Sequence, residues 1–282
     1  MIKNILKCFL VIVPVFLLSG CELALFDPKG PVAEEAKSLI IISTLLMLII
    51  ILPVLFMIVY FPYKYRKNNK TEDYRPDWEH STKIEIVVWT VPTLIVIALS
   101  YVTYVTSHSL DPRKPIVSDQ EQMVIQVVAM DWKWLFIYPE QGIATVNEIS
   151  IPVNTPIQFQ ITSDTVMNSF FIPRLGSQIY AMAGMENRVH LMASQEGTFR
   201  GVSANYSGFG FSGMKFKVHS VDNEGFVNWV AKVKQSEQVL NSETLKQLQE
   251  KTKDHPIEYF SQVVDQQFEK LIEKYSGAKN VE

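Results

Sequence analysis

The 282-residue sequence contains only two cysteines, and its five histidines are scattered without the spacing of a metal site. Zinc and copper sites need several imidazole or thiolate ligands that converge, so neither residue type indicates one here. The net charge of -3 also lacks the basic excess of a nucleic-acid-binding protein. No Ser-His-Asp order, paired carboxylate site or phosphate-binding glycine loop is present in the sequence. The residues therefore offer no catalytic chemistry of their own, and we expect no nucleic-acid partner.

The N-terminus has the layout of a secretory signal peptide. Lys3 and Lys7 precede an apolar run, and small residues follow before Cys21. The tetrapeptide LSGC at 18–21 resembles a bacterial lipobox, in which cleavage precedes the cysteine and its thiol is acylated. We therefore predict a signal peptide over residues 1–20 and a lipid anchor on Cys21, which leaves no cysteine pair for a disulfide. The alternative is an uncleaved N-terminal anchor.

Two long segments without charged residues follow, at 38–63 and 86–107. Each is longer than the ~20 residues that a helix needs to cross the hydrocarbon core, so both predict membrane helices. The connector at 64–83 carries six Lys and Arg residues, whereas the outer flank of each segment carries two. The positive-inside rule places this connector in the cytoplasm. Cys21 and everything after about residue 108 then lie outside, in agreement with the signal peptide.

Beyond the second segment, short apolar and β-branched runs alternate with Pro, Gly, Asn and Asp clusters. This pattern predicts an antiparallel sandwich or barrel. From Gly225 the composition shifts to Lys, Glu and Gln, and a set of apolar residues recurs at helical spacing. We therefore predict amphipathic helices that pack on the sandwich or on a partner. These apolar residues are Ile257, Phe260, Val263, Val264, Phe268, Leu271 and Ile272.

The expected fold class is thus membrane α plus β. We expect two transmembrane helices, a β-sandwich and a C-terminal helical extension. The expected domains are the signal peptide (1–20), a lipid-anchored two-helix membrane domain (21–110), an exported β domain (111–224) and a helical region (225–282).

The stretch GVSANYSGFGFSGM, at 201–214, has the cadence of a metal-binding loop but contains no Cys, His or carboxylate. With two helices followed by an outside sandwich, the chain resembles subunit II of the haem-copper respiratory oxidases. In the cytochrome c oxidase branch, that sandwich is a cupredoxin. Its loop follows Cys-x-Glu-x-Cys-x-x-x-His-x-x-Met, and these residues bind a dinuclear copper centre with a further upstream His.

Laid on this sequence, the copper-ligand pattern retains only its methionine. The six ligand positions fall on Asn168, Ser203, Asn205, Ser207, Phe211 and Met214. A mixed-valence copper pair needs bridging thiolates and imidazoles, which Ser, Asn and Phe cannot replace. The resemblance therefore implies a cupredoxin-like domain without the dinuclear copper site, and a chain that binds no metal or other cofactor.

Several further stretches resemble the quinol oxidase branch of the cytochrome bo type. They are NSFFIPRLGSQIYAMAGM at 168–185, WTVP at 89–92 and DWKW at 131–134, together with the lipobox and the helical tail. The resemblance implies a structural and assembly subunit of a proton-pumping ubiquinol oxidase in the bacterial inner membrane. The expected partners are subunit I, which holds the haem groups and copper, further small membrane subunits, ubiquinol at the level of the complex, and membrane lipids. Cytochrome c is not an expected partner.

Glu85 begins the second apolar segment at the cytoplasmic side. It resembles the subunit II glutamate at the mouth of one proton-uptake path in this superfamily, and a carboxylate at a membrane boundary is able to relay protons. The alternative is an interfacial glutamate that only marks the end of the helix. For Trp132 and Trp134 we expect a packing role, since the chain has no redox donor from which they would relay electrons.

Three alternative functions differ in class or in substrate. A menaquinol oxidase subunit of the same superfamily would share the copperless loop. A tethered cupredoxin-like binding lipoprotein would leave Glu85 and the two closely spaced spans without a purpose. A copper-bearing cytochrome c oxidase subunit is excluded by the missing ligands.

Overall fold

The computed structural model describes residues 24–66, 78–264 and 266–276, and it divides the chain into two compact units. Within the described residues, the β domain comprises 24–34 and 115–276, and the helical unit comprises 35–114. The predicted signal peptide and the predicted lipidation site Cys21 lie outside the described residues.

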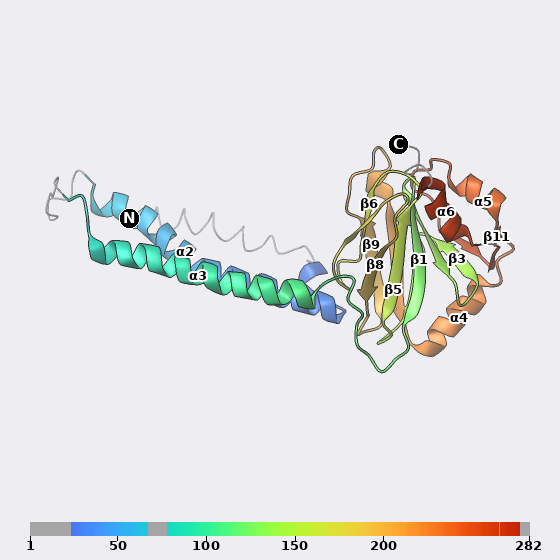
Figure 1. The fold of residues 1–282 in the computed structure, drawn as a ribbon, viewed down its shortest axis with the longest axis horizontal. Helices are drawn as coiled ribbons and strands as arrows, with labels where there is room; N and C mark the ends of the chain where they lie inside the picture. The colour runs from blue at the N-terminus through green and yellow to red at the C-terminus, as the bar shows by residue number, and fades with distance from the viewer. Residues whose placement is uncertain (1–23, 67–77, 265, 277–282) are drawn as a thin grey trace, which may run out of the picture. The chain divides into compact units, whose positions relative to one another are not determined.

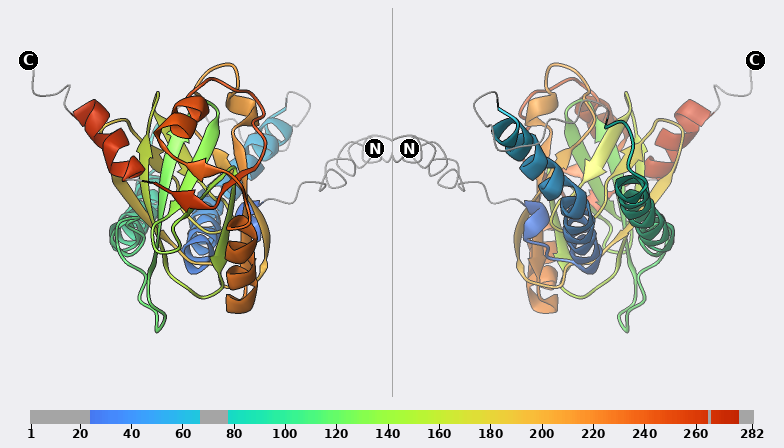
Figure 2. Two further views of the ribbon diagram at one scale, coloured as in Figure 1. Left: turned by 90° about the vertical axis from the view of Figure 1, so that its right-hand side faces the viewer. Right: turned by 90° about the vertical axis from the view of Figure 1, so that its left-hand side faces the viewer.

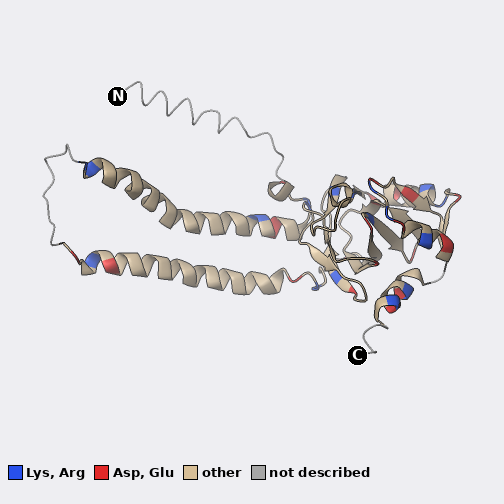
Figure 3. Cartoon of the chain, turned by 90° about the horizontal axis from the view of Figure 1, so that it is seen from above, with Lys and Arg blue, Asp and Glu red and all other residues tan. Residues whose placement is uncertain are grey.

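The helical unit consists mainly of α2 (Pro31–Lys64), which begins within the β domain, and α3 (Thr82–Ser109). Both helices are long and apolar enough to cross a membrane, and Figure 3 shows that their charged residues lie near the helix ends. Each contains internal proline, Pro53 and Pro62 in α2 and Pro92 in α3, which membrane helices tolerate better than soluble ones. The predicted pair of spanning helices is confirmed.

The β domain contains two sheets that pack face to face (Figures 1 and 2). The six-stranded sheet has the order β12-β3-β2-β1-β5-β8 and the five-stranded sheet the order β4-β10-β9-β6-β7. The six strands are β12 (Glu258–Phe260), β3 (Ile143–Val146), β2 (Lys133–Tyr138), β1 (Met123–Met130), β5 (Ile157–Ser163) and β8 (Asn187–Leu191). The five are β4 (Glu148–Pro152), β10 (Lys215–Val221), β9 (Gly197–Ser203), β6 (Asn168–Phe171) and β7 (Ile179–Ala181). The predicted sandwich is confirmed.

The expectation of purely antiparallel pairing is wrong. β1 pairs with β5 in parallel, and β4 pairs with β10 in parallel. The chain leaves the six-stranded sheet after β3, contributes β4 to the other sheet, and then returns as β5. This crossing brings β5 back beside β1 in the same direction, an arrangement that short apolar runs alone do not reveal.

The inner faces of the two sheets enclose an aromatic core. Trp134, Phe136 and Phe159 from the six-stranded sheet meet Phe170 and Phe216 from the other, and all five are buried. The rings of Phe170 and Phe216 stack with centroids 5.2 Å apart, and Phe136 lies 5.0 Å from Phe216. Aromatic contacts of this kind add stability beyond the area that they bury. The expected packing role of Trp134 is confirmed.

A second apolar cluster covers the outer face of the six-stranded sheet. Successive residues of a strand point to opposite faces, so Val127 enters the inner core while Val128 enters the outer cluster. The outer side is closed by the C-terminal extension, residues 234–276, as Figures 1 and 2 show. Its elements are β11 (Val239–Leu240), α5 (Ser242–Leu248), β12, β13 (Gln262–Val263) and α6 (Gln267–Ser276), which follow α4 (Asn223–Val233). Burial on both faces explains why β2 contains no exposed residue.

The prediction that residues 257–264 form a helix is wrong. Phe260 lies in β12, which pairs with β3 and forms the edge of the six-stranded sheet, and Val263 lies in β13, which pairs with β11. The apolar spacing of this stretch fits a helix, but pairing with the sheet edge determines its structure. The helical prediction holds further on, where Phe268 and Leu271 are buried on one face of α6.

The first described residues are bound to the sandwich. The amide of Lys29 donates to the carbonyl of Arg174, and the amide of Ser194 donates to the carbonyl of Lys29, both at 2.7 Å. Gly30 is needed at this contact, because a Cβ there would lie 2.2 Å from the carbonyl oxygen of Met192. The segment just after the predicted lipidation site is therefore part of the fold of the β domain.

Candidate functional site

Three of the six copper-ligand positions lie together at one end of the sandwich. Asn168 in β6 and Ser203 in β9 are buried, and the Ser203 hydroxyl donates to Oδ1 of Asn168 at 3.1 Å. Met214 is also buried, and its carbonyl accepts from the amide of Ser203 at 3.1 Å. A short polar contact thus occupies the place where the family pattern has a thiolate and an imidazole.

The other three positions, Asn205, Ser207 and Phe211, lie in the middle of the 201–214 loop. Nδ2 of Asn205 donates to the carbonyl of Met167 at 2.9 Å, and the carbonyl of Ser207 accepts from the indole of Trp132 at 3.0 Å. Phe211 begins the short 3₁₀ helix η2 (Phe211–Gly213), and its ring meets the edge of Tyr206 at a centroid distance of 5.6 Å. The loop is closed by amide, carbonyl and aromatic contacts.

The donor set at these positions does not fit dinuclear copper. It consists of hydroxyl and amide oxygens, one phenyl ring and one thioether, whereas such a centre needs thiolate bridges and imidazoles. Elsewhere in the described residues, no group of three or more His, Cys, Asp or Glu side chains converges on a common point. The loop has the methionine of the family pattern but not its thiolates and imidazoles.

The glycines of the loop make room for Trp132. This residue stands at the tip of the β1–β2 hairpin with a φ of 63°, a left-handed conformation that is uncommon for a bulky side chain. Its indole rests on Gly210, where a Cβ would come within 2.3 Å of the ring, and its N–H bonds the carbonyl of Ser207. The expected packing role of Trp132 is confirmed, and the glycine spacing now has a physical reason.

Buried charges join the sandwich to the C-terminal extension, and the first of them along the chain is in β2. Lys133 is fully buried, and its ammonium donates to the carbonyls of Leu248 and Glu250, both at 2.7 Å, where α5 ends. Burial lowers the pKa of Lys133, although nearby carboxylates oppose this shift. The DWKW motif does not predict this use of its lysine, because the partners are carbonyls more than a hundred residues away.

Glu148, at the start of β4, is the second buried charge. It accepts hydrogen bonds from the Tyr259 hydroxyl in β12 and from Nε2 of His219 in β10 at 3.0 Å. Burial alone would raise the pKa of Glu148, but the bonds from Tyr259 and His219 outweigh it and lower this pKa. The carboxylate therefore ties β12, the edge strand supplied by the extension, to the five-stranded sheet.

Glu85 lies in the first turn of α3, where a carboxylate is favoured by the helix dipole. Its Oε1 is 2.5 Å from Nδ1 of His80, and both side chains are about half exposed. The sequence does not predict this pair. A spacing of five residues across a helix start gives no periodic signal for it.

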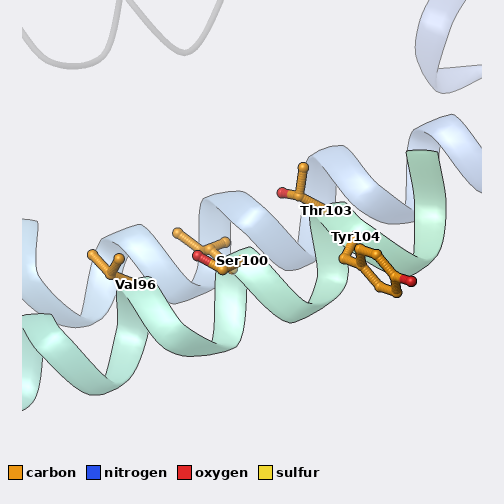
Figure 4. Close-up of a pocket in the computed structure, with 5 residues that line it drawn as sticks. Val96, Ser100, Thr103 and Tyr104 are labelled. Carbon is orange, nitrogen blue, oxygen red and sulfur yellow. The ribbon is translucent and has the colours of Figure 1, made fainter.

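A shallow groove of about 430 Å³ runs along α3 and is lined by Val96, Leu99, Ser100, Thr103 and Tyr104 (Figure 4). The lining combines apolar side chains with the hydroxyl groups of Ser100, Thr103 and Tyr104. Grooves with small and hydroxylated residues allow a neighbouring membrane helix to approach closely.

Three family models match the chain. The one described as "Cytochrome C oxidase subunit II, transmembrane domain" matches residues 20–105, and the one for the periplasmic domain of the same subunit matches 139–221. The third, described as "COX Aromatic Rich Motif", matches 234–279 and so coincides with the C-terminal extension.

Curated relatives cover nearly the whole chain. Cytochrome bo(3) ubiquinol oxidase subunit 2 of Pseudomonas putida is 54% identical over 263 residues, which is 93% of this chain and 84% of that protein. Ubiquinol oxidase subunit 2 of Acetobacter aceti is 53% identical over 263 residues, 93% of this chain and 85% of that protein. Among solved structures, the periplasmic domain of subunit II of a Bradyrhizobium japonicum cytochrome oxidase matches with a TM-score of 0.40 and 24% identity. It covers 42% of this chain and 96% of that chain.

We predict that Gly210→Ala displaces the indole of Trp132 and breaks its bond to Ser207. Overpacking of this kind typically costs about 1–3 kcal/mol of the free energy of unfolding. Thermal unfolding and near-ultraviolet circular dichroism of the purified protein measure the loss of stability and of fixed indole packing. Ser212→Ala, an exposed position of the same loop, is the matched control and should leave both unchanged. A Gly210→Ala variant with the stability and spectrum of the unmodified protein would contradict the role assigned to the glycine.

Proposed function

We propose a role for this chain on the basis of its family. The chain belongs to the family of subunit II of the bo(3)-type ubiquinol oxidases, which are terminal respiratory oxidases. It is a membrane protein with two spanning helices and a periplasmic domain, and its place in an oxidase complex implies other subunits. On this premise we propose a bacterial inner-membrane location, with a lipid anchor at Cys21 beside the segment that joins the sandwich.

Within that complex, the chain supports the enzyme without holding a redox centre. The donor set at Asn168, Ser203 and Ser207 is the observation that carries this proposal, because it lacks both thiolates and imidazoles. A copperless subunit II has no acceptor for electrons from a soluble cytochrome. Electrons therefore enter from ubiquinol through subunit I, which holds the haem groups and the copper of the oxygen-reducing site.

The membrane helices supply the contact with that partner. Their side chains are largely exposed in the helical unit, and the groove along α3 offers hydroxyl groups to a neighbouring helix. We propose that subunit I packs against these faces. Further small membrane subunits and lipids would complete the surroundings of the two helices.

We also propose that Glu85 is a proton-entry group of the complex. It stands at the cytoplasmic end of α3, and its carboxylate lies 2.5 Å from the imidazole of His80. A carboxylate paired with an imidazole at a membrane boundary is suited to collect protons from water and pass them inward. The alternative is a carboxylate that only stabilises the start of α3. In that case its removal would leave turnover unchanged.

Oxygen uptake by the purified complex tests the electron donor. We expect ubiquinol to support uptake and reduced cytochrome c to support none, because the entry site for cytochrome c electrons lacks its copper ligands. Subunit identification together with haem and copper analysis of the same preparation shows whether the chain is part of an oxidase. Purification of the chain without other subunits, or rapid uptake with reduced cytochrome c, would contradict the proposal.

Glu85→Ala tests the proton-entry role. We expect turnover with ubiquinol to fall about tenfold, less than the hundredfold or more contributed by a proton-transfer group at a reacting centre, because Glu85 lies at the membrane boundary. Subunit and haem content should stay unchanged. Glu79→Ala, an exposed carboxylate that precedes the first residue of α3, is the control. Unchanged turnover of Glu85→Ala in a fully assembled complex would leave Glu85 with only its role at the helix start.

A further inference from the structure

Two segments carry the copper-ligand positions, the 201–214 loop and the loop at 164–169, which includes the first two residues of β6. In a copper-bearing form, the metal would cross-link them, because its ligands come from both. Here they are joined by three hydrogen bonds: from Ser203 to Asn168 at 3.1 Å, from Asn205 to Met167 at 2.9 Å, and from the amide of Ala204 to the carbonyl of Ser169 at 3.0 Å. Neutral hydrogen bonds stabilise a fold far less than a full set of metal ligands does.

The C-terminal extension touches the 201–214 loop directly. The ammonium of Lys253 lies 5.2 Å from the centroid of the Phe209 ring, within the range of a cation–π contact. The carboxylate of Asp254 rests on Gly213, where a Cβ would come within 2.3 Å of Oδ1. The turn at 253–254 therefore lies against η2.

This turn is itself fixed to the sandwich on both sides. Before it, Lys133 holds the carbonyls of Leu248 and Glu250; after it, Nδ2 of Asn147 donates to the carbonyl of His255 at 2.9 Å. Lys133 directly follows Trp132, whose indole packs in the 201–214 loop. The hairpin tip, the loop and the extension are thus one connected set of contacts.

The end of α6 holds the other loop. The Tyr275 hydroxyl donates to the carbonyl of Asp164 at 2.6 Å, and the ammonium of Lys274 lies 3.0 Å from the Asp164 carboxylate. Asp164 is buried, and its amide is bonded to the carbonyl of Ala129 in β1. The hydroxyl of Ser163, its neighbour, bonds the carbonyl of Val166. Through Asp164 and Ser163, the end of α6 is thus connected to the loop that leads to Asn168.

We propose that the C-terminal extension is a brace that holds both loops in place and takes over the cross-linking that a metal ion would provide. The brace acts at two separate points, the 253–254 turn on one loop and the Lys274–Tyr275 pair on the other. The proposal rests on the interpretation of the 201–214 loop as a copper loop without its ligands, and it is independent of which quinol donates electrons. It assigns a function to the aromatic-rich C-terminal motif.

Hydrogen–deuterium exchange on the assembled, detergent-solubilised oxidase tests the brace. Tyr275→Phe removes the bond to the carbonyl of Asp164 and leaves the ring in place. We expect amides of peptides covering residues 164–170 to exchange about fivefold faster, the effect of one lost net hydrogen bond on local opening. Peptides of β1 should keep their protection. Glu273→Gln, an exposed neighbour on α6, is the control and should match the unmodified protein.

Lys133→Met tests the second point, since it removes both carbonyl contacts at the end of α5 with little change in side-chain length. We expect faster exchange in peptides covering 203–214, while those of β1 again stay protected. Faster exchange of α6 alone, with both loops as protected as in the unmodified complex, would overturn the proposal. If the Lys133→Met subunit fails to assemble, the result for Tyr275→Phe decides the question. Oxygen uptake with ubiquinol in the same preparations separates this result from the electron-donor assignment.

Discussion

Burial of the six-stranded sheet on both faces is the constraint on which the rest of the β domain depends. A sheet with apolar residues on both sides cannot stand at a sandwich surface, so a second layer must cover it. The C-terminal extension supplies that layer with α5, α6 and the edge strand β12. Polar groups that this cover buries must also be satisfied, which is why Lys133 of β2 and Glu148 of β4 each find a partner in the extension. The same cover then reaches the two loops at the end of the sandwich.

The contacts that hold the 201–214 loop in shape do not depend on copper ligands. Its shape is maintained by Trp132 on Gly210, by the Ser203–Asn168 bond and by buried Met214, none of which needs a metal. Its chemistry depends on side chains that the sequence no longer has. In the proposed function, this combination accounts for a subunit that has a cupredoxin-like sandwich while its complex takes electrons from a membrane quinol.

The sequence predicts the parts of this structure that depend on composition and local pattern. Uncharged runs predict the two membrane helices, and alternating short runs predict the sandwich. Features set by distant contacts are not predictable in this way. Phe260 shows the limit, since its spacing fits a helix while the open edge of β3 makes it a strand residue. The carbonyl partners of Lys133 and the pairing of His80 with Glu85 likewise leave no periodic signal.

The most direct test of the central claim, that a copper loop persists here without its ligands, is copper binding by a reconstructed site. The variant carries Asn168→His, Ser203→Cys, Asn205→Glu, Ser207→Cys and Phe211→His in the full-length subunit within its complex. Because Asn168, Ser203 and Met214 already lie together, the account predicts additional copper in the complex with the electron paramagnetic resonance spectrum of a mixed-valence pair. A companion variant that keeps Ser203 and Ser207 should gain no such centre, since the thiolate bridges are missing. A folded and assembled reconstruction that binds no additional copper would contradict the account.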